Sequence, residues 1–333
     1  MTLHPRLGAA LAALLAAPLA AACSDSAARP AAGGAPAAHA TPRPAPTPSP
    51  TAALPAYAIE SLRARGYGGG RLLVGERLGG TAAYTVHRVT WPSQGGTMTG
   101  LAGIPTGPGP FPVAIVNHGY IPAAQYRVGQ DSTKYADAFA AAGILTVSPD
   151  YPGYAGSSPP EPDLVPIEAE AVAAMDLIGS LSTLPQADAR RVAVAGHSNG
   201  GGVAELVMVV DPRVRAVVLY APVSTDMADN ARRWWTRHAG GTGPLGTPDA
   251  DPLAYAQISP RTHLRRGGPP VLVLQGTDDE DIPAEWTAAT VAALQAHGVR
   301  TRFVSFPGAR HNLAGADLAR ANGLAVEWMR GAS

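Results

Sequence analysis

The segment Arg191-Val192-Ala193-Val194-Ala195-Gly196-His197-Ser198-Asn199-Gly200 decides how this chain folds. Its first five residues form a short apolar run of strand length, and residues 200–210 continue as a helical pattern. Between them lies Gly-x-Ser-x-Gly, whose glycines permit a strained turn that lifts a serine hydroxyl above a sheet. Chance produces this pattern often, but a position between a strand and a helix is the setting that it requires. We therefore predict that Ser198 is a nucleophile.

Outward from this turn, apolar runs of strand length alternate with helical patterns. The expected strands cover residues 112–117, 143–147, 192–195, 214–220, 271–274 and 302–306. The expected helices cover residues 132–142, 167–181, 200–210, 284–297 and 316–329. Period-two alternation over residues 83–89 and 98–104 predicts an opening hairpin. This order predicts an α/β fold with a mainly parallel sheet flanked by helices, whose reactive groups gather at the carboxyl ends of the strands.

A nucleophilic serine needs a base and an acid from elsewhere in the chain. An imidazole must take the hydroxyl proton, and a carboxylate must fix the imidazole tautomer. In this architecture both follow the serine along the chain, the acid before the histidine, and each lies on a loop after a strand. His311 is the histidine that meets both conditions. Several carboxylates follow the strand at 271–274, and the spacing to Ile282-Pro283 favours Asp279, with Asp278 as the alternative.

Acyl transfer also needs hydrogen-bond donors for the developing oxyanion, each worth about 3 kcal/mol when well aimed. In this architecture the donors are backbone amides. One is predicted at Asn199, directly after the serine. The second is predicted at Tyr120, because the strand at 112–117 leads into His118-Gly119-Tyr120.

With these residues in place, the chain resembles the catalytic domain of the prolyl oligopeptidase family and related α/β hydrolases, including dienelactone hydrolase-like and cutinase-like enzymes. The resemblance spans about residues 83–330. Matching pieces occur in collinear order at residues 107–112, 118–119, 150–157, 188–201, 258–260, 276–279 and 308–311. It implies an α/β-hydrolase fold, with the catalytic serine at Ser198, the acid at Asp279 and the base at His311. In the cutinase-like relatives a Gly-Tyr pair supplies an oxyanion amide, which corresponds to Gly119-Tyr120.

Two departures from the oligopeptidase pattern leave the substrate open. Too few residues precede the first strand to hold the large propeller domain, and no paired glutamates are placed to hold a free peptide amino terminus. The sequence therefore predicts a serine hydrolase that cleaves ester or peptide/amide bonds of small molecules through an acyl-enzyme. A prolyl oligopeptidase-like peptidase, a carboxylesterase and a cutinase-like polyester hydrolase all remain possible.

Residues 222–268 interrupt the alternation of strands and helices directly before the strand that carries the acid. Their position predicts an insertion that covers the site as a lid. Trp234 and Trp235 form an adjacent aromatic pair flanked by arginines, which favours a place at the rim of a substrate pocket. Packing of the insertion onto the body of the domain is the structural alternative for both tryptophans.

Composition excludes several other classes of function. Lys+Arg and Asp+Glu both number 25, so no uniform basic field exists to hold nucleic acid or an anionic membrane. The chain has one cysteine, Cys23, which excludes internal disulfides, all-cysteine zinc cages and a catalytic thiol in the folded part. We expect no cofactor and no metal.

The amino terminus predicts export. Residues 1–22 hold a short run rich in Leu and Ala that reads as a signal peptide rather than a membrane-spanning helix. The run ends at Leu19-Ala20-Ala21-Ala22-Cys23, which resembles the lipidation site of bacterial lipoproteins, although Ala20 stands where that pattern usually has leucine. Residues 23–56 are rich in Pro and Ala and predict an extended tether before a catalytic domain at 57–333. Cys23 would anchor the protein to a membrane through lipid, with plain secretion as the alternative.

Two readings from other classes are weaker. A lipoprotein that binds ligands without catalysis would be favoured by loss of a triad residue, and all three are present. A metal hydrolase built on Asp226, His238 and His263 is disfavoured, because their separations match no helix-borne ligand pair.

Overall fold

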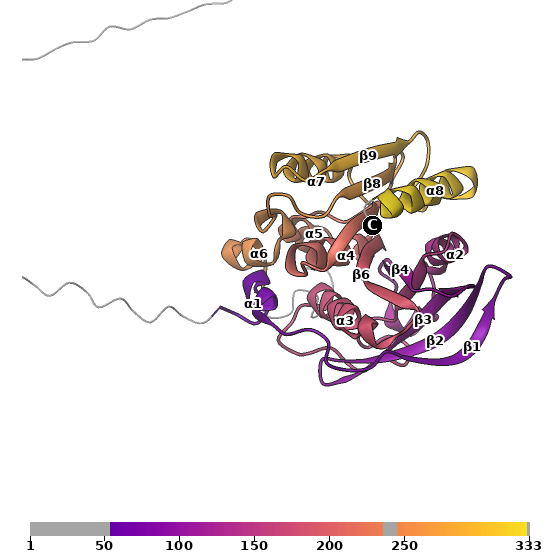
Figure 1. Ribbon diagram of the computed structural model, residues 1–333. Helices are drawn as coiled ribbons and strands as arrows, with labels where there is room; N and C mark the ends of the chain where they lie inside the picture. Colours follow the sequence, from indigo (N-terminus) through magenta and orange to yellow (C-terminus); the bar gives the residue numbers. More distant parts are fainter. Residues whose placement is uncertain (1–53, 236–244, 332–333) are drawn as a thin grey trace, which may run out of the picture. The chain divides into compact units, whose positions relative to one another are not determined.

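A computed structural model describes residues 54–235 and 245–331 of the chain. Within this part the strands form one nine-stranded sheet in the order β1-β2-β3-β5-β4-β6-β7-β8-β9 (Figure 1). The described residues belong to one compact unit, Ala52–Ser333. The predicted signal peptide, Cys23 and nearly all of the predicted tether lie outside the described residues.

The first three strands are antiparallel. They are β1 (Leu73–Gly80), β2 (Tyr84–Ser93) and β3 (Gly96–Pro105), and β3 continues the antiparallel pairing onto β5. The β2–β3 hairpin confirms the opening hairpin predicted from alternation. The sequence analysis missed β1, because every residue of this edge strand is exposed and leaves no apolar face to recognise.

The six remaining strands are parallel and carry the predicted α/β alternation. They are β4 (Phe111–Asn117), β5 (Leu145–Pro149), β6 (Ala187–His197), β7 (Val214–Tyr220), β8 (Val271–Gly276) and β9 (Thr301–Phe306). Their pairing runs β5-β4-β6-β7-β8-β9, so each carboxyl end points to the same edge of the sheet. The mainly parallel sheet of an α/β-hydrolase fold is therefore confirmed.

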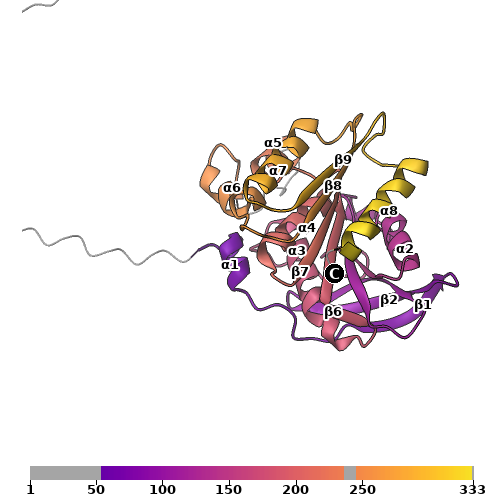
Figure 2. The same ribbon diagram turned by 45° about the horizontal axis from the view of Figure 1, so that its top comes forward.

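Helices cover both faces of this sheet (Figure 2). They are α1 (Ile59–Ala64), α2 (Thr133–Ala141), α3 (Pro166–Ser180), α4 (Asn199–Val210), α7 (Ala284–Ala296) and α8 (Gly315–Gly331). Alternate residues of the parallel strands enter two separate cores. Val192 and Val194 of β6 pack with α3 and α4, whereas Ala193 and Ala195 pack with α2 and α8.

The predicted insertion at 222–268 contains two short helices, α5 (Met227–Arg233) and α6 (Pro252–Ile258). An aspartate caps each of them. Asp226 accepts a hydrogen bond from the amide of Ala228, and Asp251 accepts one from the amide of Ala254. Single-turn 3₁₀ helices lie at Ala123–Gln125, Leu181–Thr183 and Pro260–Thr262 in the described connections.

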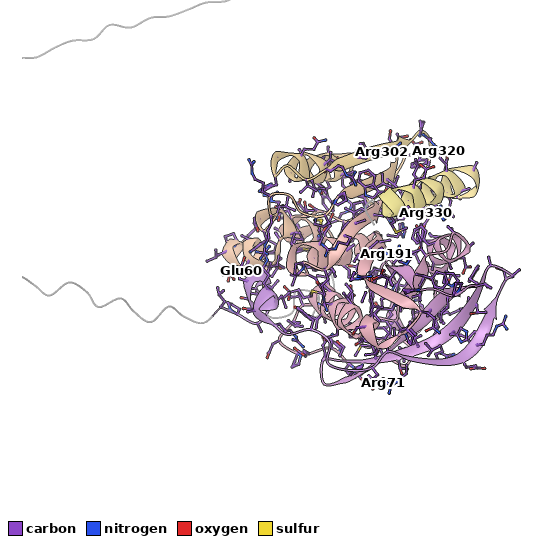
Figure 3. All side chains as sticks on the ribbon, viewed as in Figure 1. Glu60, Arg71, Arg191, Arg302, Arg320 and Arg330 are labelled. Carbon is purple, nitrogen blue, oxygen red and sulfur yellow. The ribbon has the colours of Figure 1, made fainter. Side chains whose placement is uncertain are left out.

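Charged side chains on the outside of the domain come from many elements. Figure 3 labels Arg71 before β1, Arg191 on β6, Arg302 on β9, and Arg320 and Arg330 on α8. Positive charge is thus spread around the surface in this view. Among the described residues, no helix is both long enough and apolar enough to span a bilayer.

Candidate active site

Ser198 occupies the sharp turn between β6 and α4. Its backbone has φ +54° and ψ −119°, a region that side chains rarely adopt. A Cβ on Gly196 would lie 1.9 Å from the carbonyl oxygen of Gly200, and a Cβ on Gly200 would lie 2.3 Å from that of Asn117. Only glycine fits at either position, so the two flanking glycines of the motif allow the strained serine.

His311 and Asp279 meet on neighbouring loops, one after β9 and the other after β8. The Nδ1 atom of His311 lies 3.1 Å from the Asp279 carboxylate. The backbone N–H groups of Ile282 and Asp281 donate to Asp279 Oδ1, at 2.8 Å and 3.0 Å. Burial alone raises the pKa of Asp279, but the bond from His311 and these backbone bonds outweigh it and hold the pKa below its ordinary value. Asp279 is thus an ionised partner for the imidazole.

Asp278 does not share this contact. Its side chain accepts a hydrogen bond from the hydroxyl of Thr277 at 3.0 Å, and its amide donates to the carbonyl of Ala309. Of the two candidate acids, the structure therefore places Asp279, not Asp278, against His311.

A cavity of about 920 Å³ opens at this edge of the sheet. Ser198 and His311 line it together, although His311 is only 5% exposed. Asp279 stands behind the imidazole. The tryptophan pair, Trp234 and Trp235, lines the cavity at the end of α5 and also packs against the hydrophobic core, so its place at the rim of a substrate pocket stays a prediction.

The two residues predicted to supply oxyanion amides line the same cavity. Asn199 is the first residue of α4, where a backbone N–H has no acceptor within its helix. Tyr120 follows Gly119 on the loop after β4 and is 63% exposed. Their role as donors stays a prediction.

Sequence reasoning missed three ionisable side chains near the serine. Asp131 lines the cavity from the segment before α2, Lys134 from the first turn of α2, and His197, the variable residue of the motif before Ser198, from the end of β6. Asp131 accepts hydrogen bonds from His197 and from the backbone of Gly119. No spacing in the sequence links Asp131 to the motif, so only the fold brings them together.

The sequence analysis also missed Glu170. It lies on α3, lines the cavity, and accepts one hydrogen bond from the Asn199 side-chain amide at 2.7 Å. Burial raises its pKa to about 8, and the Asn199 bond only partly opposes this. Its titratable neighbours across the cavity wall are Tyr151 and Tyr154, which carry no positive charge. The available signal was the pair of glutamates among the first ten residues of α3, which are otherwise apolar.

His118 is buried at the start of the loop after β4. Its ring stacks on Tyr126 at 4.6 Å and lies 3.9 Å from the ring of Tyr151, and its Nδ1 meets the carbonyl of Gly119 at 2.7 Å. Burial lowers the pKa of His118 to about 4, so the ring is neutral at physiological pH. This aromatic packing fixes the start of the segment that carries Tyr120.

The residues considered as ligands of an alternative metal site make other contacts where the structure describes them. Asp226 forms an ion pair with Arg261 at 3.0 Å, and His263 bonds to the carbonyl of Ser259. His238 lies outside the described residues. Over residues 54–235 and 245–331, no three metal-binding side chains come together.

Two family profiles match the chain. The profile of the prolyl oligopeptidase family matches residues 169–329, and that of FrsA-like esterases matches residues 76–234. The first range contains Ser198, Asp279 and His311, and the second contains Tyr120 and Ser198. The predicted resemblance is therefore confirmed. No curated protein matches the chain in sequence.

Solved structures of esterases and peptidases share the fold. Acetyl xylan esterase from Paenibacillus sp. R4 has a TM-score of 0.61 and 14% identity, over 83% of this chain and 92% of the esterase. Acetyl xylan esterase 1 from Thermoanaerobacterium sp. JW/SL YS485 has a TM-score of 0.58 and 19% identity, over 81% and 90%. A puromycin-hydrolyzing peptidase of Mycobacterium tuberculosis has a TM-score of 0.56 and 22% identity, over 79% and 39%. The chain spans 36% to 42% of the peptidase chains that it resembles.

The contact between Asp279 and His311 yields a first prediction. Asp279→Asn removes the charge that orients the imidazole, and we expect turnover to fall about 10⁴-fold while the melting temperature changes little. Asp278→Asn is the matched control on the same loop, and we expect it to retain most activity. Steady-state kinetics of both variants test this, and a larger loss in Asp278→Asn would move the acid to Asp278.

Glu170 yields a prediction about pH. Because its pKa is raised to about 8, it is neutral at pH 7 and becomes charged as the pH rises past 8. The new charge would face the side chain of Asn199, whose backbone amide is predicted to stabilise the oxyanion. We therefore expect wild-type turnover to fall between pH 7 and 9. Glu170→Gln stays neutral and retains an acceptor for Asn199, so its turnover should be flat over that range.

The same shift has a consequence for stability. Folded Glu170 holds a proton that the unfolded chain releases near its ordinary pKa of 4.5, so the free energy of unfolding falls as pH rises from about 4.5 to 8. Glu170→Gln removes this dependence of the free energy of unfolding on pH.

The turnover prediction has its own contrary outcome. If wild type and Glu170→Gln lose equal turnover between pH 7 and 9, a group other than Glu170 is responsible.

Proposed function

We propose that the chain, a serine hydrolase of the α/β-hydrolase fold, cleaves carboxylic esters of small molecules through an acyl-enzyme on Ser198. The observation that carries the proposal is that His311, held by Asp279, lines one cavity together with Ser198. A charged acid, a buried imidazole and a strained serine at one edge of a parallel sheet suit nucleophilic catalysis.

The steps follow from these positions. Ser198 Oγ attacks the ester carbonyl while His311 takes the hydroxyl proton, and the carbonyl oxygen becomes an oxyanion facing the amides of Tyr120 and Asn199. Collapse breaks the bond to the alcohol, which leaves with the proton from His311. Water then attacks the acyl-enzyme, again losing a proton to His311, and the acid product departs as Ser198 regains its proton.

The similarity to solved esterase structures supports ester substrates over peptides. The two acetyl xylan esterases are matched over 90% and 92% of their chains, and the puromycin-hydrolyzing peptidase over 39%. The described residues hold only the α/β unit and the α5–α6 insertion, with no second domain to restrict access. Amide cleavage is the second candidate, because the prolyl oligopeptidase profile covers all three triad residues.

A substrate panel tests the proposal. We expect the purified chain to hydrolyse short acyl esters faster than aminoacyl amides or polyester film, and Ser198→Ala to lose both turnover and labelling by a fluorophosphonate. Amides cleaved faster than esters would establish the peptidase alternative. If the wild-type protein cleaves neither esters nor amides and does not react with the fluorophosphonate, the non-catalytic binding protein becomes the supported alternative.

The tryptophan pair yields a prediction about selectivity. Trp234 and Trp235 line the cavity, whereas Trp286 of α7 stands edge-on to Trp234 at 5.5 Å outside the cavity lining. We expect Trp234→Ala or Trp235→Ala to change the ratio of activities on short and long acyl esters. Trp286→Ala, the matched control, should lower the melting temperature with an unchanged ratio. If all three variants only lose stability, the pair packs the insertion and does not select substrates.

We also propose that the protein is exported and anchored through lipid on Cys23. The support lies in the sequence alone: the apolar run before Cys23 and the Pro/Ala-rich tether after it. Membrane fractions labelled with a fatty-acid analogue would carry the label in wild type and lose it in Cys23→Ser. Wild-type protein found unlabelled outside the cell would establish plain secretion instead.

A further inference from the structure

Asp131 stands at the centre of the hydrogen bonds that join the catalytic loops. Its Oδ2 atom accepts from the amide of Gly119 at 2.7 Å and lies 2.8 Å from Nδ1 of His197. Its Oδ1 atom lies 2.8 Å from the ammonium of Lys134. The side chain is 13% exposed, and its backbone has φ +67°, in the left-handed region that aspartate adopts only at some cost.

The bond to Gly119 fixes the loop that carries the predicted oxyanion amide of Tyr120. This loop packs closely on the cluster: a Cβ on Gly119 would lie 3.0 Å from Asp131 Oδ2 and 3.3 Å from the Cβ of Ser198. A buried backbone amide that lost its acceptor would have to move or stay unpaired. Removing Asp131 therefore frees the amide of Gly119 directly beside the residue that is to stabilise the oxyanion.

His197 continues the connection to the catalytic histidine. Its Nε2 atom lies 3.3 Å from the carbonyl oxygen of His311, and the two rings are 4.7 Å apart. Both ring nitrogens of His197 thus face oxygens that only accept: the carboxylate on one side and the carbonyl on the other. These two contacts hold the His197 ring between the Asp131 carboxylate and the loop that carries His311.

The other groups around this pair are consistent with a charged Asp131. Burial raises the pKa of Asp131, but the bond from His197 and the charges of His197 and Lys134 hold it well below its ordinary value. Lys134 also donates to Asn312, the residue after the catalytic histidine, at 2.9 Å. The Tyr135 ring lies 6.0 Å from the His197 ring, and His311 faces His197 from the loop after β9.

We propose that Asp131 is a positioning residue of this active site: through Gly119, His197 and Lys134 it holds the oxyanion loop and the catalytic-histidine loop in place around Ser198. Its effect on turnover rests on the proposed function. It is not the triad acid, because its contact to the catalytic histidine runs through His197.

Three substitutions separate positioning from packing. Asp131→Ala removes every bond of the carboxylate. Asp131→Asn keeps, on its one oxygen, the acceptor for both Gly119 and His197, but it removes the charge and turns an amide toward Lys134. Asp211→Asn is the matched control, since Asp211 is a buried carboxylate bonded to Arg213 at 2.6 Å, between α4 and β7.

We expect Asp131→Ala to lower kcat about 100-fold with KM within about twofold of wild type, as for loss of an oxyanion donor. Asp131→Asn should lose less, because Gly119 keeps its acceptor. Asp211→Asn should lower the melting temperature without changing kcat per folded molecule. A kcat of Asp131→Ala within threefold of wild type, together with a lower melting temperature, would overturn the proposal.

A spectroscopic measurement tests the cluster without any substrate. In ¹⁵N-histidine NMR spectra, assigned with His197→Gln, we expect the ring-nitrogen signals of His197 to shift in Asp131→Ala, which removes the oxygen that Nδ1 contacts. This result together with an absence of turnover on every substrate would mean that the proposed function fails while the cluster stands. Signals of His197 that do not differ between wild type and Asp131→Ala would overturn the link from Asp131 to the catalytic histidine.

Discussion

At the carboxyl edge of the sheet, three stretches of backbone meet at distances that leave no room for a side chain. The end of β4 at Asn117 lies against Gly200 of α4, and the carbonyl of Gly200 lies against Gly196 of β6. This contact forces the turn between β6 and α4 to be tight, and the strained backbone of Ser198 is its result. The same contact brings the start of α4 next to the loop after β4, where both predicted oxyanion donors lie. The position of the nucleophile thus depends on two missing Cβ atoms.

The number of donors around each buried carboxyl group decides its charge. Asp279 and Asp131 each receive bonds from backbone amides and from an imidazole, and both are held ionised. Glu170 receives one bond from a neutral amide and keeps its proton up to a pKa of about 8. Within the described residues, the Glu205 oxygens of α4 have no hydrogen-bond partner, and burial raises the pKa of Glu205 well above its ordinary value. Asp279 and Asp131 therefore carry negative charge beside His311 and His197, whereas Glu170 on the same cavity stays neutral at pH 7.

Much of the fold could be predicted from the sequence, because parallel strands covered on both faces are continuous apolar runs. The predicted strand at 214–220 agrees with β7 at both ends. The nucleophile motif could also be placed, since its glycines, strand and helix are all local. Edge strand β1 could not be predicted, because all its residues are exposed and no apolar pattern marks it. Asp131 could not either: it is joined to His197 only by the folding of α2 against β6, and no local spacing encodes that contact.

Lys134 is the only lysine of the chain, and it belongs to the cluster beside the nucleophile. Reagents that attack primary amines, such as N-hydroxysuccinimide dyes, aldehyde-coated supports and amine-reactive crosslinkers, therefore find one side-chain target in the whole protein, next to the catalytic cavity. Tethering the protein to a surface through this side chain would therefore place the support beside its own cavity.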